Sequence, residues 1–150
     1  MSELRELYQT TILDHNKKPR NFRVPEHVNR EAQGVNPLCG DEVRVMLEVE
    51  DGVVTDVGFQ GSGCAISTAS ASMMTETVKG KPVEEVLQLF EGFHDLLTGP
   101  PVDEVELGEM GKLAVFAGVR EFPMRVKCAT LPWHTLKSAL EQSGEVVRTE

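Results

Sequence analysis

Three cysteines and one aspartate have the residue types and spacing of a metal site. Cys39 and Asp41 stand in the turn NPLCGDE with Cys-x-Asp spacing, and Cys64 and Cys128 follow farther along the chain. Together they supply three soft thiolate donors and one oxygen donor, the number that a tetrahedral zinc or iron centre needs. Side chains two residues apart in a strand point to the same side, so Asp41 can reach the ion that Cys39 reaches. The carboxylate is the more exchangeable ligand, which indicates a site that opens.

Other roles for these residues stay open from the sequence alone. Each cysteine by itself is a candidate small core residue, and Asp41 is equally a candidate turn residue. A disulfide framework is disfavoured, because an odd number of cysteines cannot pair fully and 150 residues can form a core without covalent staples. A Cys-His-Asp hydrolase made of Cys64, His134 and Asp41 would leave two cysteines unexplained. His134 is also a candidate neighbour of the metal site, although a surface role is more common for such a histidine.

The composition is that of a globular protein with no sign of nucleic acid or membrane as a partner. The chain is 40% apolar and 26% charged, and we expect residues 1–150 to form a single domain. A net charge of -9 disfavours nucleic acid, because phosphate binding needs clustered Lys and Arg. There is no apolar run of membrane-spanning length, and the charged N-terminus MSELRELYQ lacks a signal-peptide core. A cytoplasmic protein with reduced thiols is therefore expected.

One local exception to the acidic balance is a basic stretch near the N-terminus. Five basic residues fall within fourteen positions: Lys17, Lys18, Arg20, Arg23 and Arg30. Such a run is either a docking face or a solvated loop, and the solvated loop is the more common outcome.

The first half of the chain predicts a helix followed by a β-hairpin. Apolar residues at helical spacing from Leu4 to Ile12 predict an amphipathic helix that ends before Pro19. Apolar residues then alternate from Val43 to Val49 and again from Val53 to Phe59. Asp51-Gly52 between these runs is typical of a two-residue hairpin turn.

The second half predicts helices that position two of the cysteines. The expected elements are a buried helix from Ala65 to Lys79, a second helix from about Pro82, a loop from Gly92 to Gly111, a short helix from Lys112 to Glu121, an extended segment from Arg125 to Cys128 and a last helix opening with Pro132. Cys64 and Cys128 would then lie at helix N-termini, where unpaired N–H groups and the helix dipole favour a thiolate.

Several residues beside the cysteines suit a reactive centre. Gly40, Gly61 and Gly63 would let the backbone approach a bound ion or an incoming partner closely. Arg125 and Lys127, just before the third cysteine, could offset surplus negative charge, although Lys127 equally suits a solvated position. The charge of a metal ion would likewise hold together thiolates that otherwise repel one another.

These motifs resemble the U-type iron–sulfur cluster assembly scaffold family, which includes IscU-like proteins and the N-terminal domain of NifU. The likeness is carried by NPLCGDEV, GSGCAISTASASMM, RVKCATLPWHTL and the opening LYQTTILDHNKKPRNF, and it covers nearly the whole chain. It implies an α+β fold in which a three-stranded antiparallel sheet carries helices mainly on one face, with the site at one end. It also implies a strand around Glu31 to Asn36.

Within that family the chain is most similar to the SufU-type branch. Lys127 stands where the housekeeping branch has a histidine, the Leu-Pro-Pro-Val-Lys chaperone-docking motif is absent, and the connection between Cys64 and Cys128 is longer. This resemblance implies zinc bound by Cys39, Asp41, Cys64 and Cys128. It also implies a cysteine desulfurase (SufS-like) as the sulfur donor, and downstream apoproteins or other assembly factors as further partners.

The expected function is a zinc-dependent sulfur relay, and two further functions stay open beside it. Whether the protein is an enzyme stays open as well. Cys39 is the expected sulfur acceptor, because it lies in a glycine-containing loop with no helix to hold it, and the resemblance points the same way. The alternative is a scaffold that assembles an iron–sulfur cluster on Cys39, Cys64 and Cys128 and transfers it to apoproteins. The third is a structural zinc adaptor.

Overall fold

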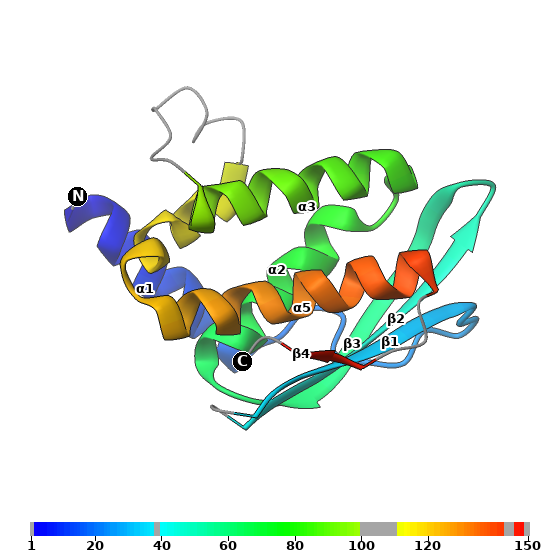
Figure 1. Cartoon of the computed structure of the whole chain (residues 1–150), viewed down its shortest axis with the longest axis horizontal. Coiled ribbons are helices and arrows are strands. Elements are labelled where there is room, and N and C mark those ends of the chain that lie inside the picture. Colours follow the sequence, from blue (N-terminus) through cyan, green and yellow to red (C-terminus); the bar gives the residue numbers. More distant parts are fainter. Residues whose placement is uncertain (1, 38–39, 100–110, 143–145, 149–150) are drawn as a thin grey trace.

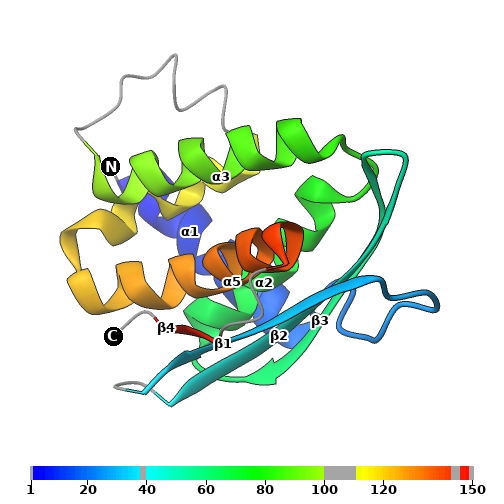
Figure 2. The ribbon, with the colours of Figure 1, turned by 45° about the vertical axis from the view of Figure 1, so that its right-hand side comes forward.

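Three antiparallel strands and a layer of helices make up the fold. The computed structural model describes residues 2–37, 40–99, 111–142 and 146–148. Strands β1 (Arg30–Asn36), β2 (Asp41–Glu50) and β3 (Val53–Ser62) pair in that order, and the helices lie mainly on one face of the sheet (Figures 1 and 2). The α+β class, the antiparallel sheet and the strand near Glu31 to Asn36 are thus confirmed.

The hairpin between β2 and β3 forms where the alternation predicts it. Asp51 and Gly52 have φ values of 53° and 76°, as a two-residue turn matched to the strand twist requires. On β2, Val43, Val45 and Leu47 point to the helices and are at most 5% exposed. Burial of these side chains fixes the register, because a slip by one residue would turn Val43, Val45 and Leu47 away from the helices.

The first two helices also agree with the sequence pattern. Helix α1 (Ser2–Lys17) ends before Pro19, and α2 (Ala65–Val78) follows β3 directly. Small side chains let α2 pack closely in the interior, and its buried residues are Ser67, Ala69, Ser70, Ala71, Ser72, Met73, Met74, Thr75 and Val78. The two helices contact each other, so the N-terminal segment covers part of α2.

Helix α3 (Val83–Thr98) continues past the point where the sequence predicts a loop. Its apolar stripe extends beyond Gly92, and the rings of Phe93 and Trp133 stack with centroids 4.8 Å apart. Glycine costs about 1 kcal/mol inside a helix, which is less than burial of Phe93, Leu96 and Leu97 contributes. The predicted loop start at Gly92 is therefore wrong; residues 100–110 of that loop lie outside the described residues.

Helix α5 (Pro123–Glu141) corrects the prediction for the end of the chain. The segment from Arg125 to Cys128 is helical rather than extended, and Pro132 lies inside the helix rather than at its start. Pro123 takes the first-turn position that a proline favours. Pro132 is tolerated within α5 although it has no N–H to donate, because the surrounding helix is almost entirely buried against α2 and the sheet.

Two short elements complete the described chain. Residues Gly111–Glu121 form a 3₁₀ helix, η1, in the region where the sequence predicts a short helix. Strand β4 (Val147–Arg148) pairs parallel with β1 at Gly34 and Val35 and adds a fourth strand that the sequence did not predict. Among the helices of the described segments, none is both long and apolar enough to cross a membrane.

Candidate metal centre

The strand register places Asp41 beside the segment that leads to Cys64. Asp41 is the first residue of β2 and pairs with Asn36, the last residue of β1. Its neighbour Glu42 pairs with Ser62, the last residue of β3, so the chain leaves β3 next to Asp41. Because Asn36, Asp41 and Ser62 are all terminal residues of their strands, the candidate site lies at the end of the sheet, as the resemblance implied. The Asp41 side chain is buried there, with 1% exposed.

Cys64 is held both by its own helix and by Asp41. It is the N-cap of α2, and its Sγ accepts a hydrogen bond from the Ser67 backbone N–H at 3.4 Å. Its backbone N–H donates to Oδ1 of Asp41 at 2.8 Å, and its Sγ lies 3.6 Å from Oδ2 of the same carboxylate. The sequence prediction of Cys64 at a helix N-terminus is thus confirmed.

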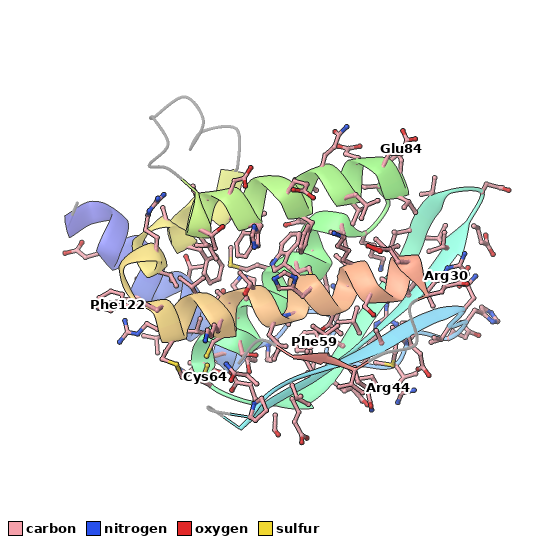
Figure 3. All side chains as sticks on the ribbon, viewed as in Figure 1. Arg30, Arg44, Phe59, Cys64, Glu84 and Phe122 are labelled. Carbon is pink, nitrogen blue, oxygen red and sulfur yellow. The ribbon has the colours of Figure 1, made fainter. Side chains whose placement is uncertain are left out.

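Cys128 reaches the same place from the second turn of α5. It is the sixth residue of that helix and is 4% exposed, so the predicted position at a helix N-terminus is wrong. The stabilisation of a thiolate by free N–H groups is limited to the first turn and does not apply to it. The Ser70 hydroxyl of α2 donates to the carbonyl of Ala129 at 2.5 Å, which fixes α5 against α2 beside Cys128. Figure 3 shows Cys64 below the first turns of α5.

The three described donors meet within metal-binding range. One ligand atom each from Asp41, Cys64 and Cys128 lies within 4.8 Å of the other two. Tetrahedral ligands of zinc, at the usual bond lengths, are about 3.6–3.8 Å apart, so a small contraction would suffice. Two thiols and one carboxylate are also suitable donors for zinc or iron. The residues present therefore fit a thiophilic ion.

Cys39, the fourth predicted ligand, lies outside the described residues. The described residues on either side of the gap are Pro37 and Gly40, and the Gly40 N–H donates to the Asn36 carbonyl at 2.9 Å. Gly40 has φ of 75°, a backbone conformation that side chains disfavour. The connection that contains Cys39 thus starts and ends beside Asp41.

His134 does not join the metal centre. Its ring packs against Phe90 and His94 of α3, with centroid separations of 5.2 and 5.5 Å. It follows Cys128 by six helical positions, about 9 Å along the axis. Burial, and then the charges of His94 and Lys137, lower the pKa of His134 below its ordinary value. The structure thus gives no support to a hydrolase triad of Cys64, His134 and Asp41.

Two of the five residues of the basic stretch form ion pairs within the chain. Arg20 pairs with Asp14 and Arg23 pairs with Asp56, each at 2.7 Å. These pairs lower the pKa of Asp14 through its hydrogen bond with Arg20, and the Arg23 hydrogen bond lowers the pKa of Asp56 against the opposing effect of its burial. Arg20 and Arg23 are thus engaged within the chain, and the choice between a solvated loop and a docking face stays a prediction.

Sequence comparison relates the chain to proteins of iron–sulfur cluster assembly. Residues 7–129 match the NifU-like N-terminal domain family. A relative from Bacillus subtilis (strain 168), the zinc-dependent sulfurtransferase SufU, is 40% identical over 146 residues, covering 95% of this chain and 97% of that protein. The iron–sulfur cluster assembly scaffold protein IscU of Streptococcus pyogenes serotype M1 is 38% identical over 144 residues, covering 96% of this chain and 89% of that protein.

A solved structure has the same architecture. It is the crystal structure of a SufU from the thermophile Fervidobacterium islandicum AW-1, described as a scaffold protein of iron–sulfur cluster assembly for the SUF system. It superposes with a TM-score of 0.81 at 35% identity, covering 91% of this chain and 98% of that chain.

Proposed function

The chain belongs to the NifU-like N-terminal domain family, and from that membership and its metal centre we propose that it is a zinc-dependent sulfur acceptor in iron–sulfur cluster biogenesis. The single observation that carries the proposal is the convergence of Asp41, Cys64 and Cys128 within 4.8 Å at the end of the sheet. The name of the Bacillus subtilis relative, a zinc-dependent sulfurtransferase, supports zinc as the ion.

We assign the ion to Asp41, Cys64, Cys128 and the adjacent Cys39. Zinc, when bound, supplies a redox-inert charge that keeps the thiolates deprotonated and close together. Asp41 is suited to being the ligand that exchanges, because a carboxylate binds a thiophilic ion less firmly than a thiolate does. The remaining residues of the centre position these donors: Ser67 through its N–H to Cys64, and Ser70 through its bond to α5.

The sulfur step is a thiolate–persulfide exchange with a cysteine desulfurase as the donor. The Cys39 thiolate attacks the terminal sulfur of the desulfurase's cysteine persulfide, and a new S–S bond forms on Cys39. The donor S–S bond breaks, and its electron pair leaves with the desulfurase thiolate, so no net oxidant is required. The sulfur then passes on to downstream apoproteins or other assembly factors.

A second candidate function is a scaffold on which a cluster is built. The names of the Streptococcus pyogenes relative and of the Fervidobacterium islandicum structure favour it, since both are described as assembly scaffolds. The same three thiolates, Cys39, Cys64 and Cys128, would then bind iron, and Asp41 would be the position opened for transfer.

One reconstitution experiment separates these functions. The purified protein, with its metal content measured as isolated, is incubated with a cysteine desulfurase and cysteine, with and without ferrous iron. We expect retained zinc, faster desulfurase turnover and a trapped persulfide that maps to Cys39 and is lost in Cys39→Ser. A stable cluster with visible absorption would favour the scaffold instead. No trapped persulfide and no change in turnover would leave the structural zinc adaptor and refute the relay.

A further inference from the structure

The three atoms that lie nearest to a Cβ added at Gly63 all belong to the side chain of Asp41. A Cβ added at Gly63 would lie 2.6 Å from Oδ1 of Asp41, 3.1 Å from its Cγ and 3.3 Å from its Cβ. Atoms of this kind do not approach within 3.0 Å, so the carboxylate would have to move. The φ of Gly63 lies outside the left-handed region. The backbone at this position would therefore accept a side chain if the carboxylate were absent.

The nearby Gly61 is required for a different reason. Its φ is 150°, and a Cβ there would collide with the backbone carbonyl of Glu42. This collision is with the paired strand β2 itself, so a side chain at Gly61 would disturb the sheet whatever residue stands at Asp41. Gly61 is thus needed for the pairing of β3 with β2, whereas Gly63 is needed for the position of the Asp41 side chain.

The oxygen that a side chain at Gly63 would displace is the one that anchors the carboxylate. Oδ1 of Asp41 accepts the hydrogen bond from the Cys64 N–H at 2.8 Å, and Oδ2 is left facing the Cys64 sulfur at 3.6 Å. Asp41 is 1% exposed and has little room for another rotamer. Displacement of Oδ1 would therefore turn Oδ2 away from the sulfurs as well.

We propose that Gly63 is a positioning residue of the metal centre, because the absence of a side chain there lets Asp41 hold the Cys64 N–H with one oxygen and offer the other to the ion. The inference rests on the proposed function, which assigns Asp41 as the exchangeable ligand. It adds the chemical reason why the Gly-Ser-Gly segment must precede Cys64. A side chain at residue 63 would convert a centre of three thiolates and one carboxylate into one of three thiolates and an open position.

The direct test is Gly63→Ala, examined by zinc competition and by Co²⁺ spectroscopy. We expect zinc affinity to fall by about 10- to 100-fold, the range found when a residue that orients a ligand is changed. The Co²⁺ form should keep its sulfur-to-metal charge-transfer absorption, because the thiolates remain, while its d–d bands shift with the lost oxygen. Unchanged affinity and unchanged d–d bands would overturn the inference.

A double-mutant cycle shows whether Gly63 acts through Asp41. In an Asp41→Ala background the atoms at 2.6 and 3.1 Å are gone, and the contact left at 3.3 Å needs a shift of only a few tenths of an ångström. Gly63→Ala should then change zinc affinity by less than about twofold, since the two sites are coupled. An equal loss in both backgrounds would refute the proposed role of Asp41.

Two further glycines serve as controls, and folding is followed by thermal unfolding of the metal-free protein. Gly118→Ala meets no atom within 4 Å and should leave affinity and stability unchanged. Gly61→Ala should destabilise the protein with or without Asp41. If the Gly63→Ala protein does not fold but the Gly63→Ala/Asp41→Ala double variant does, the inference is supported. If neither the single nor the double variant folds, the inference is overturned. Lack of stoichiometric zinc in the wild-type protein would instead contradict the proposed function.

Discussion

The metal centre and the contact between α1 and α2 are both buried polar clusters that join distant parts of the chain, yet their chemistry differs. In the α1–α2 cluster, Nδ1 of His15 lies 2.7 Å from the Ser72 hydroxyl oxygen, which also accepts the Arg20 N–H at 2.8 Å. Nε2 of His15 lies 3.6 Å from a carboxylate oxygen of Glu76. The two contacts of Ser72 have ordinary hydrogen-bond lengths, so polar groups there match one another.

The metal centre instead gathers electron-rich atoms. Its sulfur contacts, from Cys64 to Ser67 and to Asp41, are 3.4 and 3.6 Å long, and the sulfur of Cys128 lies within 4.8 Å of both ligand residues. Burial of polar groups is therefore not what marks a functional site, because both clusters are buried. What distinguishes the candidate metal centre is that a carboxylate and two thiols, all of them suitable metal ligands, face one another.

Removal of a metal ligand should have the largest effect on zinc affinity, and it tests the contrast between the metal centre and the α1–α2 cluster. Cys128→Ser keeps the size of a 4% exposed side chain but removes a thiolate, so zinc affinity should fall by more than about 100-fold, beyond the effect of changing a residue that only orients a ligand. Competition with a chromogenic chelator measures this. His134→Ala on the same helix should leave the affinity unchanged, and an equal loss there would mean that the site is misassigned.

A substitution in the α1–α2 cluster should change the stability of the fold and leave zinc affinity unaffected. Ser72→Ala removes the partner shared by His15 and the Arg20 N–H, and it should lower the free energy of unfolding by about 1–3 kcal/mol. Urea unfolding of the metal-free protein measures the change, and zinc affinity should stay within about twofold. Thr77→Ala is the matched control, because the Thr77 hydroxyl donates to the Met73 carbonyl within the same helix and joins no second element among the described residues. A parallel loss of zinc affinity in Ser72→Ala would erase the distinction between the two clusters.

The smallest effect concerns His134, which belongs to neither cluster. Its pKa is lowered in the folded protein, mainly by burial, so the unfolded chain binds the proton more readily. The stability that depends on neutral His134 is complete above the unfolded pKa of about 6.5 and decreases as the pH falls toward the folded value. His134→Gln should flatten the dependence of unfolding free energy on pH below about 6.5. An equally steep curve in the variant would show that another group is responsible.

The local elements were predictable because neighbouring residues determine them. Alternation from Val43 to Phe59 and the turn at Asp51-Gly52 require only short-range sterics and one buried face. Cys64 as an N-cap follows from the glycine-rich segment before it and the small, helix-compatible residues after it. The resemblance added the strand at Arg30–Asn36, which periodicity alone did not indicate.

The wrong predictions all concern places where packing outweighs local preference. Gly92 and Pro132 are helix-breaking residues by type, yet both lie within helices. Phe93 stacks on Trp133 between α3 and α5, and that contact stabilises both helices across the residues that would interrupt them. No pattern within either segment contains this information, because the partner lies about forty residues away in sequence.

The sequence by itself determined which side chains are candidate metal ligands, since residue types and the Cys-x-Asp spacing are chemical facts that folding does not alter. Only the tertiary structure decided how the donors meet: the register of β2 and β3 puts Asp41 against Cys64, α5 brings Cys128 from a helix interior, and Gly63 leaves space for the carboxylate. The physical reason is range. Local sterics and hydrogen bonds act over a few residues, whereas the centre depends on burial that joins three distant segments at once.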